Sequence, residues 1–166
     1  MKRLMIRMTS FAVVFFVSAA VRAQGPGSEL VGKWVRNDAA SNAGEHISIN
    51  SIPLNVEVAR QNESLLLTYT FRNGKGEVSA VTDTLKQNGQ ASQKTTKSGL
   101  QKTSSVQGNA DRKGFTISTE YKNDQGNVVR TSKEMWTKNG NGQLQVVLDM
   151  TYNGNDLHFI EVFDHQ

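Results

Sequence analysis

The sequence has no cysteine among its 166 residues. This absence excludes disulfides, thiolate nucleophiles and thiolate metal ligands together, and it also excludes a lipid-modified cysteine near the start of the chain. No covalent cross-link between side chains is therefore available, and an ordinary packed core must stabilise the fold.

Long apolar runs are equally scarce. The one clear run, Phe11 to Val21, follows the basic residues Lys2, Arg3 and Arg7. Small residues at Val21 and Ala23 complete the layout of an export signal, with cleavage expected after Ala23. At about eleven residues the run is shorter than the ~20 that span a bilayer as a helix. The alternative, an uncleaved membrane anchor, is disfavoured on that length.

These features predict the organisation of the chain. We expect a cleaved signal peptide at 1–23, a short linker at 24–28 and a single folded domain at 29–166. No second apolar run follows, so the predicted location is periplasmic or secreted, without stable membrane insertion. The sequence sets no oligomeric state.

An excess of charge of one sign is also missing once the leader is set aside. The chain has 19 Lys and Arg residues and 15 Asp and Glu residues, and four of the bases but none of the acids lie within 1–23. The remainder has 15 of each and is formally neutral. A nucleic-acid partner or an anionic membrane surface is therefore not predicted.

Catalytic motifs are absent as well. The sequence has no Gly-x-Ser-x-Gly elbow, phosphate-binding loop or dinucleotide fingerprint. Its three histidines, His46, His158 and His165, have no metal-ligand spacing. A metal site would require His158 and His165 to meet Asp156 and Asp164 in space, and scattered surface histidines are the simpler interpretation. We predict no catalytic residue, no metal and no cofactor, and therefore no enzyme.

What the chain does contain is short segments in which apolar and polar residues alternate, separated by Asn-Gly turns. In ESLLLTYTFR, for example, Leu65, Leu67, Tyr69 and Phe71 share one face. The pattern predicts an all-β, antiparallel up-and-down meander that closes into a barrel of about 8–10 strands. The expected strands are 30–37, 53–60, 64–72, 76–86, 91–98, 101–107, 114–122, 126–138, 142–152 and 156–164, with the unpatterned 38–52 as a loop.

The turns are predicted from pairs such as Asn73-Gly74, Asn139-Gly140 and Asn153-Gly154. Asparagine and glycine tolerate positive φ, which two-residue hairpin turns require.

The stretch from Lys86 to Arg112 is unusual, because its only aliphatic residues are Ala91, Leu100, Val106 and Ala110. It cannot bury much apolar surface. Either it forms a weakly covered wall of the barrel, which is the simpler interpretation, or its inner face is polar because something polar lies inside.

The opening LVGKWVRNDAASN resembles the first strand of small, exported, lipocalin-like (calycin-type) bacterial proteins, in which a Gly-x-Trp motif places a Trp as a plug at one end of the barrel. The segment KEMWTKNGNGQLQVVLDM resembles the penultimate hairpin of that group, and IEVFDHQ resembles its closing strand. The resemblance implies a β-barrel with Gly32 and Trp34 on one strand face. It implies little about activity, because most members of the group have none assigned.

One departure from the calycin pattern concerns the basic residue that often packs over the plug Trp from the last strand. The segment from His158 to Gln166 has no Arg or Lys. Arg130 and Arg60 are the candidates to replace it.

Aromatic side chains are the candidate ligand contacts, although filling of the core is the simpler interpretation of them. Glu161 shares a strand face with Phe159 and Phe163. If that face is internal, the carboxylate of Glu161 is buried and needs a partner, which would indicate a ligand. If Glu161 lies on the rim of the barrel, it does not indicate one. The candidate ligand-binding residues are Trp34, Tyr69, Phe71, Phe115, Tyr121, Trp136 and Tyr152.

The sequence thus predicts a domain that binds a small apolar or amphipathic molecule inside the barrel. The alternative is a packed barrel without an internal ligand that acts through its outer surface as an envelope or secreted interaction protein.

Overall fold

The computed structural model describes residues 26–42, 44, 49, 52–111 and 113–166. A short 3-10 turn, η1 (Ser28–Leu30), precedes ten strands. The strands are β1 (Gly32–Arg36), β2 (Asn55–Gln61), β3 (Ser64–Arg72), β4 (Val78–Lys86), β5 (Ser92–Thr95), β6 (Gln101–Gly108), β7 (Phe115–Lys122), β8 (Val128–Lys138), β9 (Leu144–Tyr152) and β10 (Asn155–His165).

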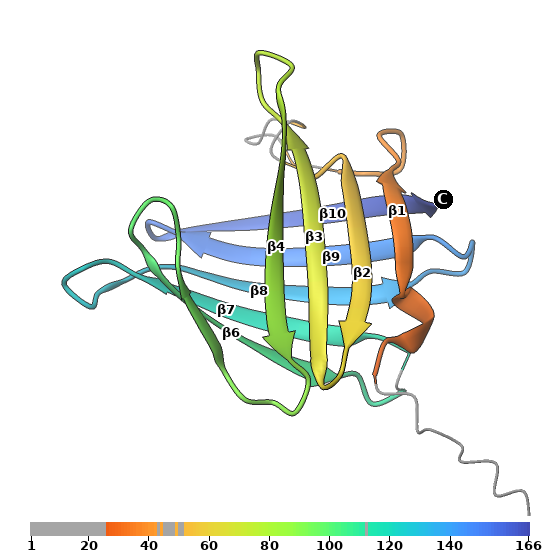
Figure 1. Cartoon of the computed structure of the whole chain (residues 1–166). Helices are drawn as coiled ribbons and strands as arrows, with labels where there is room; N and C mark the ends of the chain where they lie inside the picture. Colours follow the sequence, from red (N-terminus) through yellow and green to blue (C-terminus); the bar gives the residue numbers. More distant parts are fainter. Residues whose placement is uncertain (1–25, 43, 45–48, 50–51, 112) are drawn as a thin grey trace, which may run out of the picture.

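The strands form one antiparallel sheet that curls into a barrel. Its order is β4-β3-β2-β1-β10-β9-β8-β7-β6-β5, so consecutive strands pair except at β4 and β5, and β1 pairs with β10. In Figure 1, β2 to β4 run across β8 to β10, so that these two groups of strands form opposite walls. The predicted all-β up-and-down barrel is confirmed, with ten strands and nearly complete closure.

All ten predicted strands are present, and their ends differ from the expected ones by a few residues. The largest difference is in β5, which covers four residues (Ser92–Thr95) of the expected 91–98. After Thr95 the chain turns back through Gly99, which has a φ of 85°. Few apolar side chains are available here to extend the strand against a core, which accounts for its short length.

The turns differ from the prediction that two-residue hairpin turns form at the Asn-Gly pairs. Three of them are Asn-x-x-Gly turns, in which the positive φ lies at Gly76, Gly126 or Gly142; the glycines of the predicted pairs, Gly74 and Gly140, do not have it. In each, the asparagine side-chain oxygen accepts backbone hydrogen bonds from the residues two and four positions later. Only the turn at Asn153-Gly154 has positive φ at both residues of the predicted pair.

One end of the barrel, here called the base, is packed solid. Trp34 is fully buried, and its indole N–H donates a hydrogen bond to the Leu30 carbonyl at 2.9 Å. Phe115 stacks on Trp136 with 5.5 Å between ring centroids. The other fully buried large side chains here are Phe163, Leu65, Leu67, Leu144, Val56 and Val58. Trp34 thus plugs one end of the barrel, as the Gly-x-Trp motif implied.

His165 replaces the missing basic residue of the last strand. Its ring meets Trp34 edge-on, with centroids 4.8 Å apart. A Cβ at Gly32 would lie 2.8 Å from Nε2 of His165, so the glycine makes room for the histidine more than for the indole. Arg130 and Arg60 do not fill this place, because Arg130 stacks on Tyr121 and Arg60 donates a hydrogen bond to the Pro26 carbonyl.

The predicted signal peptide at 1–23 lies outside the described residues, as does most of the loop at 43–51. Within the part of the chain that the structure covers, no helix is long and apolar enough to cross a membrane.

Candidate functional site

The half of the barrel opposite the base is hollow. Its deeper part, the inner chamber, has a volume of about 260 Å³ and borders the base at Trp136 and Val146. Its outer part, the mouth, has about 960 Å³ and lies between β4, the β5–β6 turn and the ends of β7 to β10. The two parts share the lining residues Val81, Asp83, Lys102 and Tyr121, so they form one continuous space. This size suits a small ligand.

The wall of the inner chamber is largely apolar and aromatic. Tyr69 and Phe71 from β3 stack with 6.3 Å between centroids, and Tyr69 meets Trp136 edge-on at 6.2 Å. Val146 and Leu148 complete the wall from β9. These residues are on the inner face because the alternation of each strand continues from the packed base, where the same faces carry the core.

Charged groups enter the same space where the sheet is not closed. Asp83 of β4 is nearly buried and pairs with both Lys94 of β5 and Lys102 of β6. These ion pairs connect β4 to the far edge of the sheet, and we call this junction the seam. Burial alone would raise the pKa of Asp83, but the hydrogen bonds from Lys102 and Lys94 outweigh it and lower the pKa below its usual value.

The mouth carries a further cation. The guanidinium carbon of Arg130 lies 3.6 Å from the centroid of the Tyr121 ring, a close cation–π contact. The Nε of Arg130 is buried and has no hydrogen-bond partner in the described part of the chain. Lys102 lies on the same ring, at 5.8 Å.

Two carboxyl groups face the inner chamber from the opposite wall. Glu134 of β8 accepts a hydrogen bond from the Trp136 indole N–H at 3.1 Å. Glu161 of β10 pairs across the sheet with buried Val146, which puts its side chain on the inner face. This settles the facing of Glu161 that the sequence left open.

Both carboxyl groups resist ionisation. Burial raises the pKa of Glu161 to about 8, the charge of Glu134 adds to the effect, and Arg36 opposes it. Burial also raises the pKa of Glu134, against the hydrogen bond from Trp136 and the charge of Lys102. Burial raises the pKa of the Tyr69 hydroxyl well above its usual range. Groups with displaced pKa values that gather in a cavity mark a candidate functional site.

The structure divides the seven aromatic residues that the sequence put forward. Tyr69, Phe71 and Trp136 line the inner chamber, Tyr152 lines the mouth, and Tyr121 lines both. Trp34 and Phe115 line neither part and are packed in the base.

Of the charged lining residues, the sequence singled out Glu161, and it named Arg130 only as a candidate to pack over Trp34. It did not single out Asp83, Lys94, Lys97, Lys102 and Glu134. One signal was available, the polar stretch from Lys86 to Arg112. Its inner face is indeed polar, since Lys102 lines the cavity and the Ser104 and Thr119 hydroxyls share a buried hydrogen bond of 2.9 Å.

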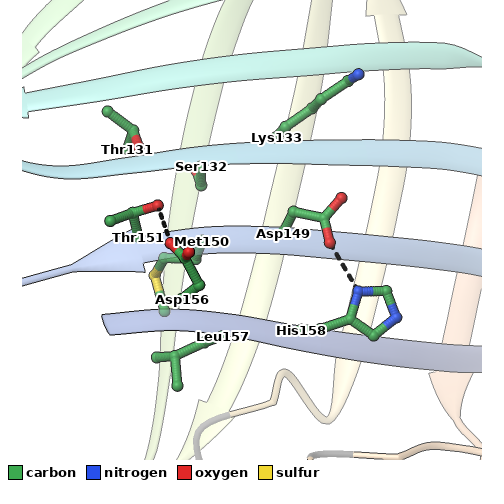
Figure 2. A pocket seen from close by; sticks show the side chains of 9 residues that line it. All are labelled: Thr131, Ser132, Lys133, Asp149, Met150, Thr151, Asp156, Leu157 and His158. Atoms are coloured by element: carbon green, nitrogen blue, oxygen red, sulfur yellow. Dashed lines mark hydrogen bonds and ion pairs between the residues drawn. The ribbon is translucent and has the colours of Figure 1, made fainter. Parts of the chain in front are cut away.

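A second hollow, of about 470 Å³, lies against β8, β9 and β10. Figure 2 shows Asp149 and His158 facing each other from neighbouring strands, 2.7 Å apart, and the Thr151 hydroxyl donating to Asp156 at 2.6 Å. The His158 and Asp149 side chains are about 60% exposed, so water competes for every contact made there. Among the described residues, no three His, Asp or Glu side chains gather as a metal site requires. His46 lies outside those residues.

Comparison with known proteins reveals similarity in structure only. No protein-family model matches the chain, and no curated protein matches it significantly. Among solved structures, the zebrafish ileal bile acid-binding protein in complex with cholic acid is similar, with a TM-score of 0.52 and 13% sequence identity. The match covers 84% of this chain and all of that one. The fold is thus of the calycin type, a class of antiparallel β-barrels.

Proposed function

We propose that this protein is an exported carrier that binds one small amphipathic molecule inside its barrel. The observation that carries the proposal is the continuous cavity formed by the inner chamber and the mouth. Its wall supplies apolar area, and its charged groups supply orientation, the combination typical of small-molecule sites. The structural neighbour was solved with cholic acid, also an amphipathic molecule, which agrees with this use of the fold.

The alternative, a packed barrel that acts through its outer surface, has less support. The base is packed as that alternative requires, but the other half of the barrel is not. In the outer hollow the His158 and Asp149 side chains are about 60% exposed, and among the described residues no three His, Asp or Glu side chains gather there as a metal site requires.

The test is native mass spectrometry of the protein purified without detergent after the full chain is expressed with export. A reproducible extra mass that disappears on denaturation is the expected result. The Val81→Trp variant should lose that mass, because Val81 lines both parts of the cavity. The control is Val78→Trp on the same strand, which is 59% exposed on the outer face and should keep it. A bare protein mass that stays unchanged after incubation with fatty acids, bile acids and alkylamines would overturn the proposal.

A further inference from the structure

The inner chamber has a preference for one sign of charge that the proposed function does not itself specify. Of the three carboxyl groups that line it, Asp83 is paired with lysines, whereas Glu134 and Glu161 have no ion-pair partner among the described residues. The nearby lysine Lys102 is already paired with Asp83 in the seam. Arg36 is also committed, since its guanidinium binds Asp38 at 2.5 Å and the carbonyl oxygens of Ile49 and Ile52.

Glu161 is the clearest case. Within the described residues its carboxyl group makes no hydrogen bond and no ion pair, although it lines the cavity from a strand that is buried on both sides of it, at Phe159 and Val162. A polar group shielded from water without a partner destabilises the fold. Glu161 is partly buried, and a cation bound in the inner chamber would supply the partner that the described residues do not.

The wall opposite the carboxyl groups suits a cation as well. Tyr69 and Phe71 present stacked rings to the chamber, and Tyr121 lies at its border with the mouth. Aromatic faces attract organic ammonium groups through the ring quadrupole, and the attraction grows where water is excluded. Carboxylates on one side and rings on the other thus surround a single volume.

From this arrangement we infer that the inner chamber binds the positively charged end of an amphipathic organic cation, with its ammonium group beside Glu161 and Glu134 and its apolar part directed to the mouth. The inference rests on the proposed carrier function and names the class of ligand. In the mouth, Met150 and Leu157 provide apolar contacts for the remainder of the molecule.

The opposite polarity, an anion held by Arg130, is the competing possibility. Arg130 is stacked on Tyr121, and its buried Nε has no hydrogen-bond partner among the described residues. Lys94 and Lys102 are neutralised in part by Asp83. Arg130, Lys94 and Lys102 therefore have partners within the protein and Lys97 of the mouth is exposed to water, whereas Glu161 has no partner among the described residues.

The affinity for a cation should also depend on pH, because Glu161 exchanges a proton when the cation binds. Glu161 has a pKa of about 8, so it is largely protonated at neutral pH and must lose its proton when an ammonium group arrives. The charges that act on it are Glu134 from β8 and Arg36 from β1. Glu134 is in turn influenced by Lys102 from β6 and Asp83 from β4. Affinity for a cation should therefore rise as the pH increases toward 8 and then level off.

The test compares three decyl amphiphiles that differ only in their head group: trimethylammonium, sulfonate and hydroxyl. Neither charged head group titrates between pH 6 and 9, so any pH dependence belongs to the protein. Calorimetry below the micellar concentration should find the trimethylammonium compound bound at least about tenfold more tightly than the others, a difference of about 1.4 kcal/mol. Its affinity alone should rise between pH 6 and 8.

Glu161→Gln should reduce the affinity for the ammonium compound by at least about tenfold and leave the other two unchanged. Glu57→Gln, the same substitution at an exposed position of β2, should change none of them. The comparison of head groups needs no variant, so it remains decisive even if a substitution disturbs folding.

The two proposals fail in different ways. If the sulfonate binds most tightly, or if all three bind alike and ignore Glu161→Gln, the inferred ligand class is wrong while the carrier function stands. If none of the three binds, and native mass spectrometry also finds no ligand, both proposals are wrong.

Discussion

At the scale of the residue, Glu161 shows how an apolar surrounding changes the chemistry of a carboxyl group. Burial and the charge of Glu134 outweigh the opposing charge of Arg36 and raise the pKa of this group to about 8. The folded state therefore holds a proton that the unfolded chain releases near its ordinary pKa of 4.5.

This difference predicts a pH dependence of stability. A carboxyl group with a raised pKa stabilises the folded state fully below pH 4.5, and this contribution is lost as the pH rises through about 8. Between pH 4.5 and about 8, the free energy of unfolding of the wild type should therefore fall relative to that of Glu161→Gln. The fall should reach up to about 1.4 kcal/mol per pH unit. Urea denaturation of both proteins at several pH values measures it. A constant difference between the two would contradict the burial of Glu161.

Gly32 permits a second test at this scale. A methyl group at this position would approach the His165 ring within 2.8 Å of Nε2, and the φ of 147° is unfavourable for other residues. Gly32→Ala should therefore destabilise the protein by about 1–3 kcal/mol. In a His165→Ala background the clash is removed, so the same substitution should cost measurably less. Equal costs in the two backgrounds would show that the backbone conformation alone requires glycine.

The sequence predicted the burial of Trp34 from a local motif, but it left the facing of Glu161 open. The reason is that both faces of the last strand are apolar, with Phe159 and Phe163 on one side and Ile160 and Val162 on the other. Alternation tells which residues share a face, but only pairing with Val146 tells which face is inside.

At the scale of the element, the seam is the place where the barrel is not closed by a strand ladder. Asp83 of β4 lies 11 and 19 residues from Lys94 and Lys102, with a long turn between them. No spacing rule connects these positions, which is why sequence patterns predicted the strands but not the ion pairs. The polar stretch around β5 and β6 was recognised, and its partner on β4 was not.

Asp83→Asn should loosen this junction. It leaves Lys102, whose side chain is 15% exposed, without a counter-charge, and it should destabilise the fold by about 3 kcal/mol. Asp149→Asn breaks a pair on the surface and should cost less than about 1 kcal/mol. Thermal or urea unfolding compares the two. Similar costs would mean that the seam contributes no more than a surface contact.

Asp83→Asn should also alter how the stability of the protein depends on acid pH. The two lysines hold the pKa of Asp83 below its ordinary 3.8, so the stability that this carboxylate provides is present above pH 3.8 and lost as the pH falls through its lowered pKa. Wild-type protein should lose stability on acidification in that range more steeply than Asp83→Asn. Parallel acid titrations followed by circular dichroism test this, and parallel curves would be inconsistent with it.

At the scale of the whole molecule, the barrel resembles a cup with a packed base and a hollow upper half. The aromatic residues that the sequence put forward do not belong to one site, because the distance along each strand decides whether a ring lies in the base or the cavity. Phe115 opens β7 and is in the base, whereas Tyr121 near the end of the same strand lines the cavity. Both rings continue the same alternation along one strand, so only the three-dimensional arrangement reveals the division.

The central claim is that the hollow half holds a ligand while the base stays packed. A crystal structure of the protein grown with decyltrimethylammonium tests it most directly. We predict density for the ligand in the inner chamber, with the ammonium group beside Glu161 and the chain leading past Val81 to the mouth. A chamber filled by the protein's own Tyr69, Phe71 and Tyr121 side chains, without ligand density, would contradict the account.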